Sequence, residues 1–342
     1  MEYFYPGQKI RLLGIHRRIE PSREGIALKF PSRIHVAPID LNRLNFSKPG
    51  GGGIGFAVGL ENSVQIALAD EDNFVGAEKW ALEMAHIVSV MKKVFGYDRG
   101  FRIHMKISEH VKEHKGFGST VMIITSCAQA INMLFADCLP TETLRRLVGY
   151  NFVEHCKTRL ARGCETGVGT YVVLKGGIAV IADDLRPIYH SAFLPTYHVA
   201  LINPCSNRPS HDEPENLELH IKVKKEDIFS RYQKAYVALM DLIPALARND
   251  AKRIGDIFWR FQFTGTNLLM IQNYSDGGSE IYQIMAELRN SGVNIVGLSS
   301  LGPTIYAISK DVDLLTENCR RIGVDFLLTR IDNAGMLEIG FR

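Results

Sequence analysis

The sequence predicts an α+β protein with two domains, and three observations support this fold class. Its 342 residues suffice for two domains that share an interface. Segments with the two-residue period of strands lie beside longer segments with helical spacing. The chain ends in a helix–strand–helix–strand order. We place the domain boundary near residues 190–215, so that the two domains are residues 1–200 and 201–342.

The first domain is expected to begin with extended chain. Residues 26–41 predict short extended segments that are broken at Pro31 and Pro38. After a glycine-rich turn, residues 54–60 and 64–68 predict two strands that pair with each other. A sheet should therefore form early in this domain.

Helices and further strands follow in both domains. Lys175-Gly176-Gly177 lies between two apolar runs, 170–174 and 178–182, and predicts a hairpin. Residues 203–216 contain three prolines and predict an exposed loop. Helical spacing of apolar residues predicts helices at 76–95, 141–160, 226–249, 251–263, 278–291 and 311–321. Strands are predicted at 101–107, 198–202, 303–309 and 324–331.

The stretch from Lys115 to Thr120 has the composition of a phosphate-binding turn. Gly116 and Gly118 allow the backbone to turn tightly, and the apolar run 121–135 predicts a helix directly after them. The N-terminus of a helix presents unpaired N–H groups and a partial positive charge, which favour phosphate. The alternative is a turn that is capped by a hydroxyl side chain and binds no ligand.

The overall composition argues against binding to nucleic acid, against a membrane-spanning segment and against a dedicated zinc site. The formal charge is only +3, the six cysteines form no C-x-x-C pair, and the eleven histidines show no zinc-ligand spacing. The N-terminus does not resemble a signal peptide, and no apolar run reaches the roughly 18 residues of a membrane span. We therefore expect a cytoplasmic protein that binds neither nucleic acid nor membranes.

Three motifs occur in the order of a known superfamily of small-molecule kinases. His114–Ser119 is similar to a Gly-Leu-Gly-Ser phosphate loop, Gly167–Gly177 to a Ser-Gly-x-Asp motif with a following Gly-Gly pair, and Gly297–Thr304 to a third glycine-rich motif. On these residues the chain resembles the galactokinase–homoserine kinase–mevalonate kinase–phosphomevalonate kinase superfamily. The resemblance implies a phosphate-binding N-terminal domain of the ribosomal S5 type and a ferredoxin-like C-terminal domain.

Two departures from these kinases weaken a phosphoryl-transfer mechanism. Counted back from Gly176-Gly177, the position of the usual catalytic Asp is Gly169, which has no side chain to orient an acceptor hydroxyl. The third motif carries Pro303 instead of a run of small residues. The fold is therefore expected to be kept without the kinase chemistry.

One branch of the superfamily fits the chain better, namely the beta-ribofuranosylaminobenzene 5'-phosphate synthases of methanopterin biosynthesis. Its most specific motif is similar to Ser299-Ser300 followed by Gly-Pro-Thr. The segments that carry the resemblance are Arg33–His35, Gly51–Gly55, His114–Ser119, Arg159–Thr170 and Gly297–Tyr306.

This resemblance implies a reaction and its partners. Phosphoribosyl pyrophosphate condenses with 4-aminobenzoate or 4-hydroxybenzoate, pyrophosphate and carbon dioxide leave, and an aryl C-riboside 5'-phosphate forms. Mg²⁺ would be the cofactor, with Ser119 as a metal ligand, and a homodimer is expected because it is the commonest assembly. The implied binding residues are Gly51, Gly52, Gly53, His114, Lys115, Gly116, Gly118, Ser119, Thr120, Gly167, Gly169, Thr170, Ser299, Ser300, Pro303 and Thr304.

Five residues are candidates for catalysis, and each has a structural alternative. Arg33 and Arg162 would hold a phosphate or a carboxylate, or form ordinary salt bridges. His35 would carry a proton during rearomatisation, or lie hydrogen-bonded in the core. Asp40 would bind a ribose hydroxyl or metal, or pair with Arg33. Glu165 would contact a metal or the ribose, or be exposed to solvent.

Two other functions stay open at this point. One is an ATP-dependent small-molecule kinase of the same superfamily with a rearranged active site. The other is a ligand-binding paralogue without catalytic activity. The residues do not choose between the two benzoates.

Overall fold

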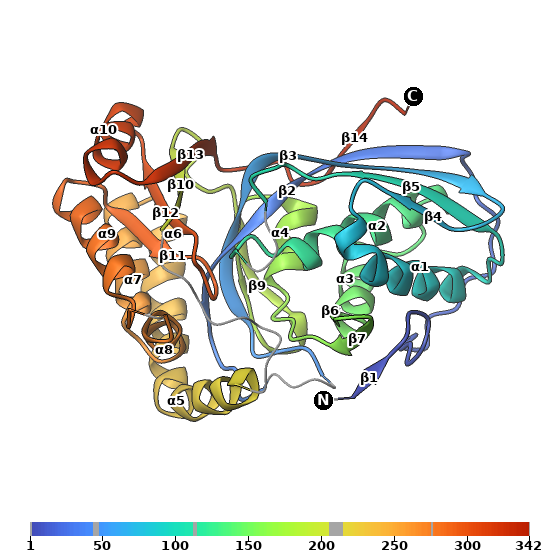
Figure 1. Ribbon diagram of the computed structural model, residues 1–342, viewed down its shortest axis with the longest axis horizontal. Helices are drawn as coiled ribbons and strands as arrows, with labels where there is room; N and C mark the ends of the chain where they lie inside the picture. The colour runs from blue at the N-terminus through green and yellow to red at the C-terminus, as the bar shows by residue number, and fades with distance from the viewer. Residues whose placement is uncertain (1, 44–47, 112–114, 205–214, 275, 342) are drawn as a thin grey trace.

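The computed structural model describes residues 2–43, 48–111, 115–204, 215–274 and 276–341, with the side chains of 215–224 outside this description. Figure 1 shows two sheets, each with its own group of helices, and a smaller sheet near the N-terminus. Among the described residues, no helix combines the length and the apolar character that crossing a membrane would require.

The larger sheet is built on two long antiparallel strands, β2 (Gly25–Pro38) and β3 (Gly53–Ala69). Five further strands complete it: β4 (Asn73–Val75), β5 (Gly100–Lys106), β8 (Ile178–Ile181), β9 (Pro187–Ser191) and β14 (Leu337–Ile339). In the pairing of β2 with β3, Arg33 lies opposite Ala57 and His35 opposite Gly55. The register thus brings two candidate residues to the middle of the sheet.

Helices cover one face of this sheet (Figure 1). They are α1 (Ala81–Phe95, after a 3-10 turn at Glu78–Trp80), α2 (Ser119–Leu134), α3 (Thr141–Tyr150) and α4 (Val168–Lys175). Helix α2 is buried on nearly every side because it packs against α1, α4 and β2. Its uniformly apolar sequence is the expected signature of such a central helix.

The second sheet has four antiparallel strands in the order β11, β12, β10 and β13. Their bounds are Ile295–Leu298, Ile305–Ser309, His198–Asn203 and Asp325–Arg330. Helices α9 (Ser279–Asn290) and α10 (Val312–Ile322) share a hydrophobic core with this sheet. Strand β10 spans the expected domain division between residues 200 and 201, and it pairs with both β12 and β13. The division into domains 1–200 and 201–342 stays a prediction.

Further helices lie between β10 and α9 in the chain. They are α5 (Glu215–Val237), a π-helical turn (Ala238–Leu242), α6 (Ile243–Ala247), α7 (Ala251–Gln262) and α8 (Thr266–Gln272). Tyr306 on β12 meets the ring of Phe56 on β3 edge to face at 5.5 Å, and Phe258 of α7 packs beside it. This aromatic contact joins the second sheet to the first.

The small sheet consists of β1 (Tyr3–Phe4), β7 (Arg159–Arg162) and β6 (Val153–Cys156), and a 3-10 turn at Asp183–Leu185 lies between β8 and β9. Several sequence expectations are confirmed by these elements. The helices at 76–95 and 121–135 and the strands at 101–107 and 198–202 are present. The four elements expected at the end of the chain are present as α9, β12, α10 and β13, but the unpredicted strand β11 lies between the first two.

Other expectations are wrong. The extended chain at 26–41 ends at Pro38 as expected, but it is not broken at Pro31, because β2 is one strand whose bulge between Phe30 and Ser32 accommodates Pro31. Residues 54–60 and 64–68 do not pair with each other; both belong to β3 and pair with β2. The expected helix 141–160 ends at Tyr150 and gives way to β6 and β7.

The expected hairpin around Lys175-Gly176-Gly177 is also wrong. Residues 168–175 form helix α4, although valines favour strands by intrinsic propensity. Burial of Val168, Val172 and Val173 between α2 and the sheet outweighs that preference. Most of the loop expected at 203–216 lies outside the described residues, and residue 215 begins α5.

Candidate active site

The glycine-rich turn ends in an uncapped helix. Gly116 and Gly118 have φ angles of 93° and 63°, the left-handed region that glycine adopts without strain. Helix α2 starts at Ser119, and no side chain caps its N-terminus. Because the first N–H groups of a helix lack partners within it, this end of α2 can bind an anion. His114 lies outside the described residues.

Arg33 of β2 lies directly against this turn. A Cβ atom added to Gly118 would come within 2.8 Å of the Arg33 guanidinium carbon. The Nε and Nη1 atoms of Arg33 are buried and have no hydrogen-bond partner among the described residues. Buried donors without partners cost free energy, so the site is prepared for an acceptor such as a phosphate oxygen. Burial lowers the pKa of Arg33, and the nearby Glu165 carboxylate opposes this shift.

Glu165 is buried and not exposed to solvent. Its Oε1 accepts a hydrogen bond from the Gly167 N–H at 2.7 Å, so the carboxylate lies just before the N-terminus of helix α4, where a negative charge is favourable. Burial raises its pKa, while the positive charges of Arg33 and Arg145 oppose that shift. Glu165 is thus a counter-charge to both arginines.

His35 is buried on the same strand as Arg33. Its Nε2 lies 3.3 Å from the hydroxyl oxygen of Thr166, and a Cβ atom on Gly53 would approach Nε2 to 2.9 Å. Burial, together with the charges of Arg33 and Lys234, holds the pKa of His35 well below its usual value. The imidazole is therefore neutral at physiological pH.

The third motif ties the turn to strand β2. The Ser299 hydroxyl donates a hydrogen bond to the Gly116 carbonyl at 2.6 Å and accepts one from the His35 N–H at 3.1 Å. The Thr304 hydroxyl donates to the Lys115 carbonyl at 2.5 Å, and the Ser300 N–H donates to the His35 carbonyl at 2.9 Å. Pro303, buried after a cis peptide bond, completes the bend. These residues fix the geometry of a candidate anion site, which consists of Arg33 and the start of α2.

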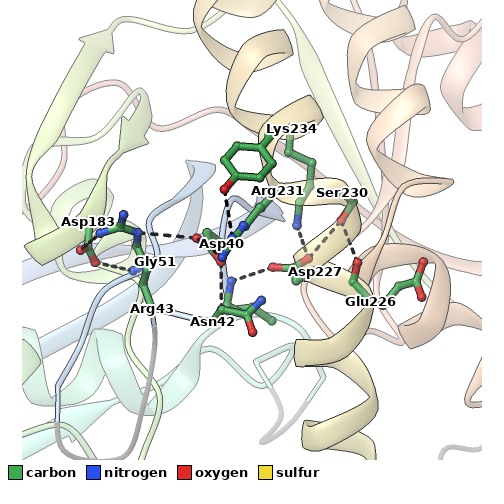
Figure 2. Close-up of polar contacts among 12 residues, drawn as sticks. Asp40, Asn42, Arg43, Gly51, Asp183, Glu226, Asp227, Ser230, Arg231 and Lys234 are labelled. Carbon is green, nitrogen blue, oxygen red and sulfur yellow. Dashed lines mark hydrogen bonds and ion pairs between the residues drawn. The ribbon is translucent and has the colours of Figure 1, made fainter.

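Asp40 lies in a separate ionic network, which Figure 2 shows. Its Oδ2 is 3.6 Å from Arg43 Nε and 3.7 Å from Arg231 Nη1. Arg43 in turn pairs with Asp183, whose other oxygen accepts the Gly51 N–H at 3.0 Å. The sequence offered Arg33 as a structural partner for Asp40, whereas the contacts observed for its carboxylate are with Arg43 and Arg231.

Gly52 and Gly53 continue this turn into β3. The Gly52 carbonyl accepts the Ile39 N–H at 3.2 Å, and Gly53 pairs with Pro38 in the ladder. The glycine-rich turn therefore joins the ends of β2 and β3 beside His35.

Arg162 lies away from Arg33 and His35. It donates a hydrogen bond to the Tyr150 carbonyl at 2.7 Å and another to the Lys9 carbonyl, and its guanidinium lies 5.6 Å from the Phe4 ring. Burial, with the neighbouring charge of Arg11, lowers its pKa to about 10. These contacts fasten the N-terminal segment and do not join Arg162 to the anion site.

Gly169 and Thr170 serve the packing of α4. A Cβ atom on Gly169 would lie 2.4 Å from a methyl carbon of Val121 on α2, so the two helices leave no room for a side chain there. This close contact gives a physical reason why the aspartate expected in a kinase is absent. The Thr170 hydroxyl donates a hydrogen bond to the Gly167 carbonyl within the first turn.

Sequence reasoning missed a buried ionic cluster behind the site (Figure 2). Asp227 of α5 pairs with Lys234 and accepts hydrogen bonds from the Leu41 N–H at 2.6 Å and the Thr266 hydroxyl at 2.5 Å. Lys234 is one of the charges that lower the pKa of His35. The available signal was the seven-residue spacing, which places Asp227 and Lys234 on one helix face together with the buried Val237 and Ala238.

Metal ligation by protein side chains is limited. Among the described residues, no group of three or more His, Cys, Asp or Glu side chains could hold a metal ion. Ser119 and Thr120 are both largely buried at the start of α2. Their hydroxyls suit Mg²⁺ that is bound chiefly by substrate phosphates and water.

Comparison with known proteins gives the same fold. The chain superposes on homoserine kinase from Cytophaga hutchinsonii with a TM-score of 0.60 at 14% identity, covering 94% of this chain and 99% of the other. It superposes on mevalonate pyrophosphate decarboxylase from Streptococcus pyogenes with a TM-score of 0.65 at 12% identity, covering 93% and 99%. The chain has the small-molecule-kinase superfamily fold.

Curated relatives are similar over most of their length. A protein named beta-ribofuranosylphenol 5'-phosphate synthase from Archaeoglobus fulgidus is 24% identical over 306 residues, covering 83% of this chain and 88% of that protein. The protein of the same name from Methanocaldococcus jannaschii is also 24% identical, covering 90% and 98%. No family model matches the chain. The chain is thus similar to enzymes in both sequence and fold.

Proposed function

We propose that this protein is an enzyme that joins phosphoribosyl pyrophosphate to 4-hydroxybenzoate or 4-aminobenzoate, with loss of pyrophosphate and carbon dioxide. The product is an aryl C-riboside 5'-phosphate, and the reaction belongs to cytoplasmic methanopterin biosynthesis. One observation carries the proposal. Buried, unpartnered donors of Arg33 lie beside the uncapped end of α2, in a chain similar to proteins named for a ribosylphenol phosphate product.

The electron balance of this reaction defines what the protein must supply. Pyrophosphate leaves with the electron pair of its bond to ribose C1, and an electron pair of the aromatic ring forms the new carbon–carbon bond. The bonding pair of the carboxylate then returns to the ring as carbon dioxide departs. No net proton enters or leaves the ring, so stabilising the departing anion and positioning the ring are the principal tasks.

The anion site suits the departing pyrophosphate. Arg33 offers a guanidinium fork, and the start of α2 offers backbone N–H groups at the same place. Lys115 on the turn is exposed and adds a further positive charge. Mg²⁺, with the Ser119 hydroxyl as its protein ligand, would neutralise charge on the leaving group.

His35 suits the aromatic partner. Because its imidazole is neutral, one ring nitrogen can accept a hydrogen bond from the hydroxyl or amino group of the benzoate. Such a bond increases electron density in the ring, which favours attack on ribose C1. Since loss of carbon dioxide restores aromaticity, His35 is not required to carry a proton away from the ring.

The test is turnover by the purified protein. Protein, Mg²⁺ and phosphoribosyl pyrophosphate are incubated with each benzoate that carries ¹³C in its carboxyl group, and labelled carbon dioxide and pyrophosphate are measured. The proposal expects both in equal amounts with one benzoate, together with a product of the mass of the C-riboside. No carbon dioxide with either acid would contradict the proposal.

The same protein sample separates the other two functions. If calorimetry shows binding of Mg–ATP and no binding of phosphoribosyl pyrophosphate, the protein would be a kinase. The fold shared with a homoserine kinase is the observation that keeps this hypothesis. Binding of phosphoribosyl pyrophosphate and a benzoate without turnover would support a non-catalytic paralogue.

A further inference from the structure

A cavity between the N-terminal segment and helix α3 plays no part in the proposed reaction. Its volume is about 360 Å³, near the lower end of the range of roughly 300–1,000 Å³ for small-molecule sites. None of its lining residues belongs to the candidate anion site. We call it the α3 cavity, and its lining residues are Leu13, Ile15, Glu142, Thr143, Arg146 and Arg186.

Two arginines make one part of the α3 cavity positively charged. The Nε of Arg146 is buried and has no hydrogen-bond partner within the described ranges, while its Nη2 lies 3.4 Å from Asp184 Oδ2. The Nη1 of Arg186 lies 3.8 Å from Glu142 Oε1, which is too far for a hydrogen bond. Because a guanidinium fork matches the geometry of a carboxylate, this part of the cavity is suited to one.

Glu142 brings an acceptor to the same cavity. Its Oε2 accepts a hydrogen bond from Arg145 at 2.7 Å. Its Oε1 is buried and has no hydrogen-bond partner among the residues that the structure describes. A buried acceptor without a partner costs free energy, and an ammonium group, with three N–H donors and a positive charge, would supply the missing donor.

The N-terminal segment supplies the apolar side of the α3 cavity. Leu13 and Ile15 line it, and the Leu13 side chain is 40% exposed. The φ angle of Leu13 is 52°, in the left-handed region that a bulky residue rarely adopts. Backbone outliers of this kind are found preferentially at ligand-binding sites. An apolar group of a ligand would cover the exposed part of Leu13.

These three features discriminate between ligands by charge. A simple anion would bring a second negative charge to Glu142, a simple cation would face two arginines, and an uncharged apolar molecule would leave buried polar atoms without partners. A zwitterion with an apolar group meets all three requirements. We propose that the α3 cavity binds an α-amino acid with an apolar side chain. Arg146 and Arg186 hold its carboxylate, and Glu142 holds its ammonium group.

Calorimetric titration of the full chain with L-leucine and L-phenylalanine tests this proposal without phosphoribosyl pyrophosphate or turnover. At least one of the two should bind with a dissociation constant of about 1 mM or lower. Three analogues of the better ligand each lack one recognised group. The acid without the amine lacks the ammonium, the amino acid amide lacks the carboxylate, and glycine lacks the apolar side chain. Each should bind at least about 10-fold more weakly.

Substitutions locate the binding site. Arg146→Met and Glu142→Gln should each weaken binding by at least about 10-fold. The matched control is Arg320→Met, at an exposed position in the last turn of α10, and it should bind as the wild type does. Arg33→Met should also bind as the wild type does, because Arg33 belongs to the separate candidate anion site. Thermal unfolding checks that every variant is folded.

Several results would overturn the proposal. Binding of neither amino acid is one, and an analogue that binds as tightly as the amino acid is another. Binding that both Arg146→Met and Glu142→Gln leave unchanged would show that the ligand lies elsewhere. Loss of binding in Arg33→Met would place the amino acid at the anion site and would contradict the proposal as well.

Discussion

Two arginines flank the buried carboxylate of Glu165, and they differ in how their hydrogen-bonding groups are used. Arg145 of α3 pairs with Glu142 at 2.7 Å and donates hydrogen bonds to the carbonyls of Gly167 and Leu185 at 3.2 and 3.0 Å. On the other side, Arg33 has no side-chain hydrogen bond among the described residues, and its Nε and Nη1 are buried.

The difference separates an arginine whose donors are used within the protein from one whose buried donors lack acceptors among the described residues. Burial lowers the pKa of both arginines, and Glu165 opposes the shift in both. Arg145 also packs 4.5 Å from the Tyr171 ring and so joins α3 to α4. Because Arg33 instead faces the open end of α2, a bound anion would supply the acceptors that it lacks.

Replacing Arg33 should produce the largest effect on activity. Arg33→Met keeps the length of the side chain but removes the charged donors to pyrophosphate, so kcat/KM should fall by about 10²- to 10³-fold. The midpoint of thermal unfolding should change little, because the native protein makes no side-chain hydrogen bond with Arg33 among the described residues. A variant with full activity would show that Arg33 does not bind the leaving group.

Replacing Glu165 should lower stability most. Glu165→Gln removes the negative charge that both buried arginines favour, and it weakens the hydrogen bond that the Gly167 N–H donates to the Glu165 carboxylate. Losing a hydrogen bond to a buried charged group costs up to about 3 kcal/mol. Urea unfolding measures this loss, and Glu109→Gln, at an exposed position, is the control. Equal stability of both variants would contradict the role of Glu165 as a counter-charge.

Arg145→Met should affect stability and leave binding of phosphoribosyl pyrophosphate almost unchanged. It removes the hydrogen bonds to Gly167 and Leu185, so the free energy of unfolding should fall by about 2 kcal/mol. Urea unfolding and calorimetric binding, measured on the same preparation, check both parts. Weak binding in a fully stable Arg145→Met protein would reverse the assignment of the two arginines.

The smallest expected effect is a change in the pKa of His35. This pKa should respond to the loss of Arg33 but not to the loss of Arg145. Arg33 is one cause of the lowered pKa of His35, and Arg145 is not. In Arg33→Met the pKa of His35 should therefore rise, while in Arg145→Met it should stay at the wild-type value. An NMR titration of the histidine ring protons measures both shifts, with His35→Gln to assign the signal.

The sign of the associated pH dependence follows from the lowered pKa. A histidine that is held neutral in the folded protein contributes stability above its unfolded pKa of about 6.5, and this stability is lost as the pH falls below that value. Between the unfolded and the folded pKa, the free energy of unfolding falls by about 1.4 kcal/mol for each pH unit of acidification and for each such group. His86, whose pKa burial lowers to about 4, adds a second contribution, so the comparison with His35→Gln is needed.

The short motifs that the sequence singled out lie together at the candidate site. The turn at 115–120, the strand with Arg33 and His35, and the motif at 299–304 come together through hydrogen bonds between Ser299, His35 and Gly116. The fold class was also predicted, because superfamily motifs occurred in order along the chain. Local composition and order suffice for such features.

Contacts between distant segments could not be predicted. Arg162 lay inside a recognised motif, yet it is held by the carbonyls of Tyr150 and Lys9. Arg145 belongs to a helix whose sequence gave no reason to single it out, and its partners Gly167 and Leu185 lie on other segments. Val172 and Val173 favoured a strand locally, and only packing against the sheet makes them helical.

The central claim is that Arg33 and the start of α2 hold the pyrophosphate of the activated ribose. Titrating Mg–phosphoribosyl pyrophosphate into the wild-type protein, Arg33→Met and Arg145→Met in a calorimeter tests it most directly. The account predicts that Arg33→Met binds at least about 30-fold more weakly, a loss of about 2 kcal/mol, while Arg145→Met binds as the wild type does. Equal affinity of wild-type protein and Arg33→Met would contradict the account.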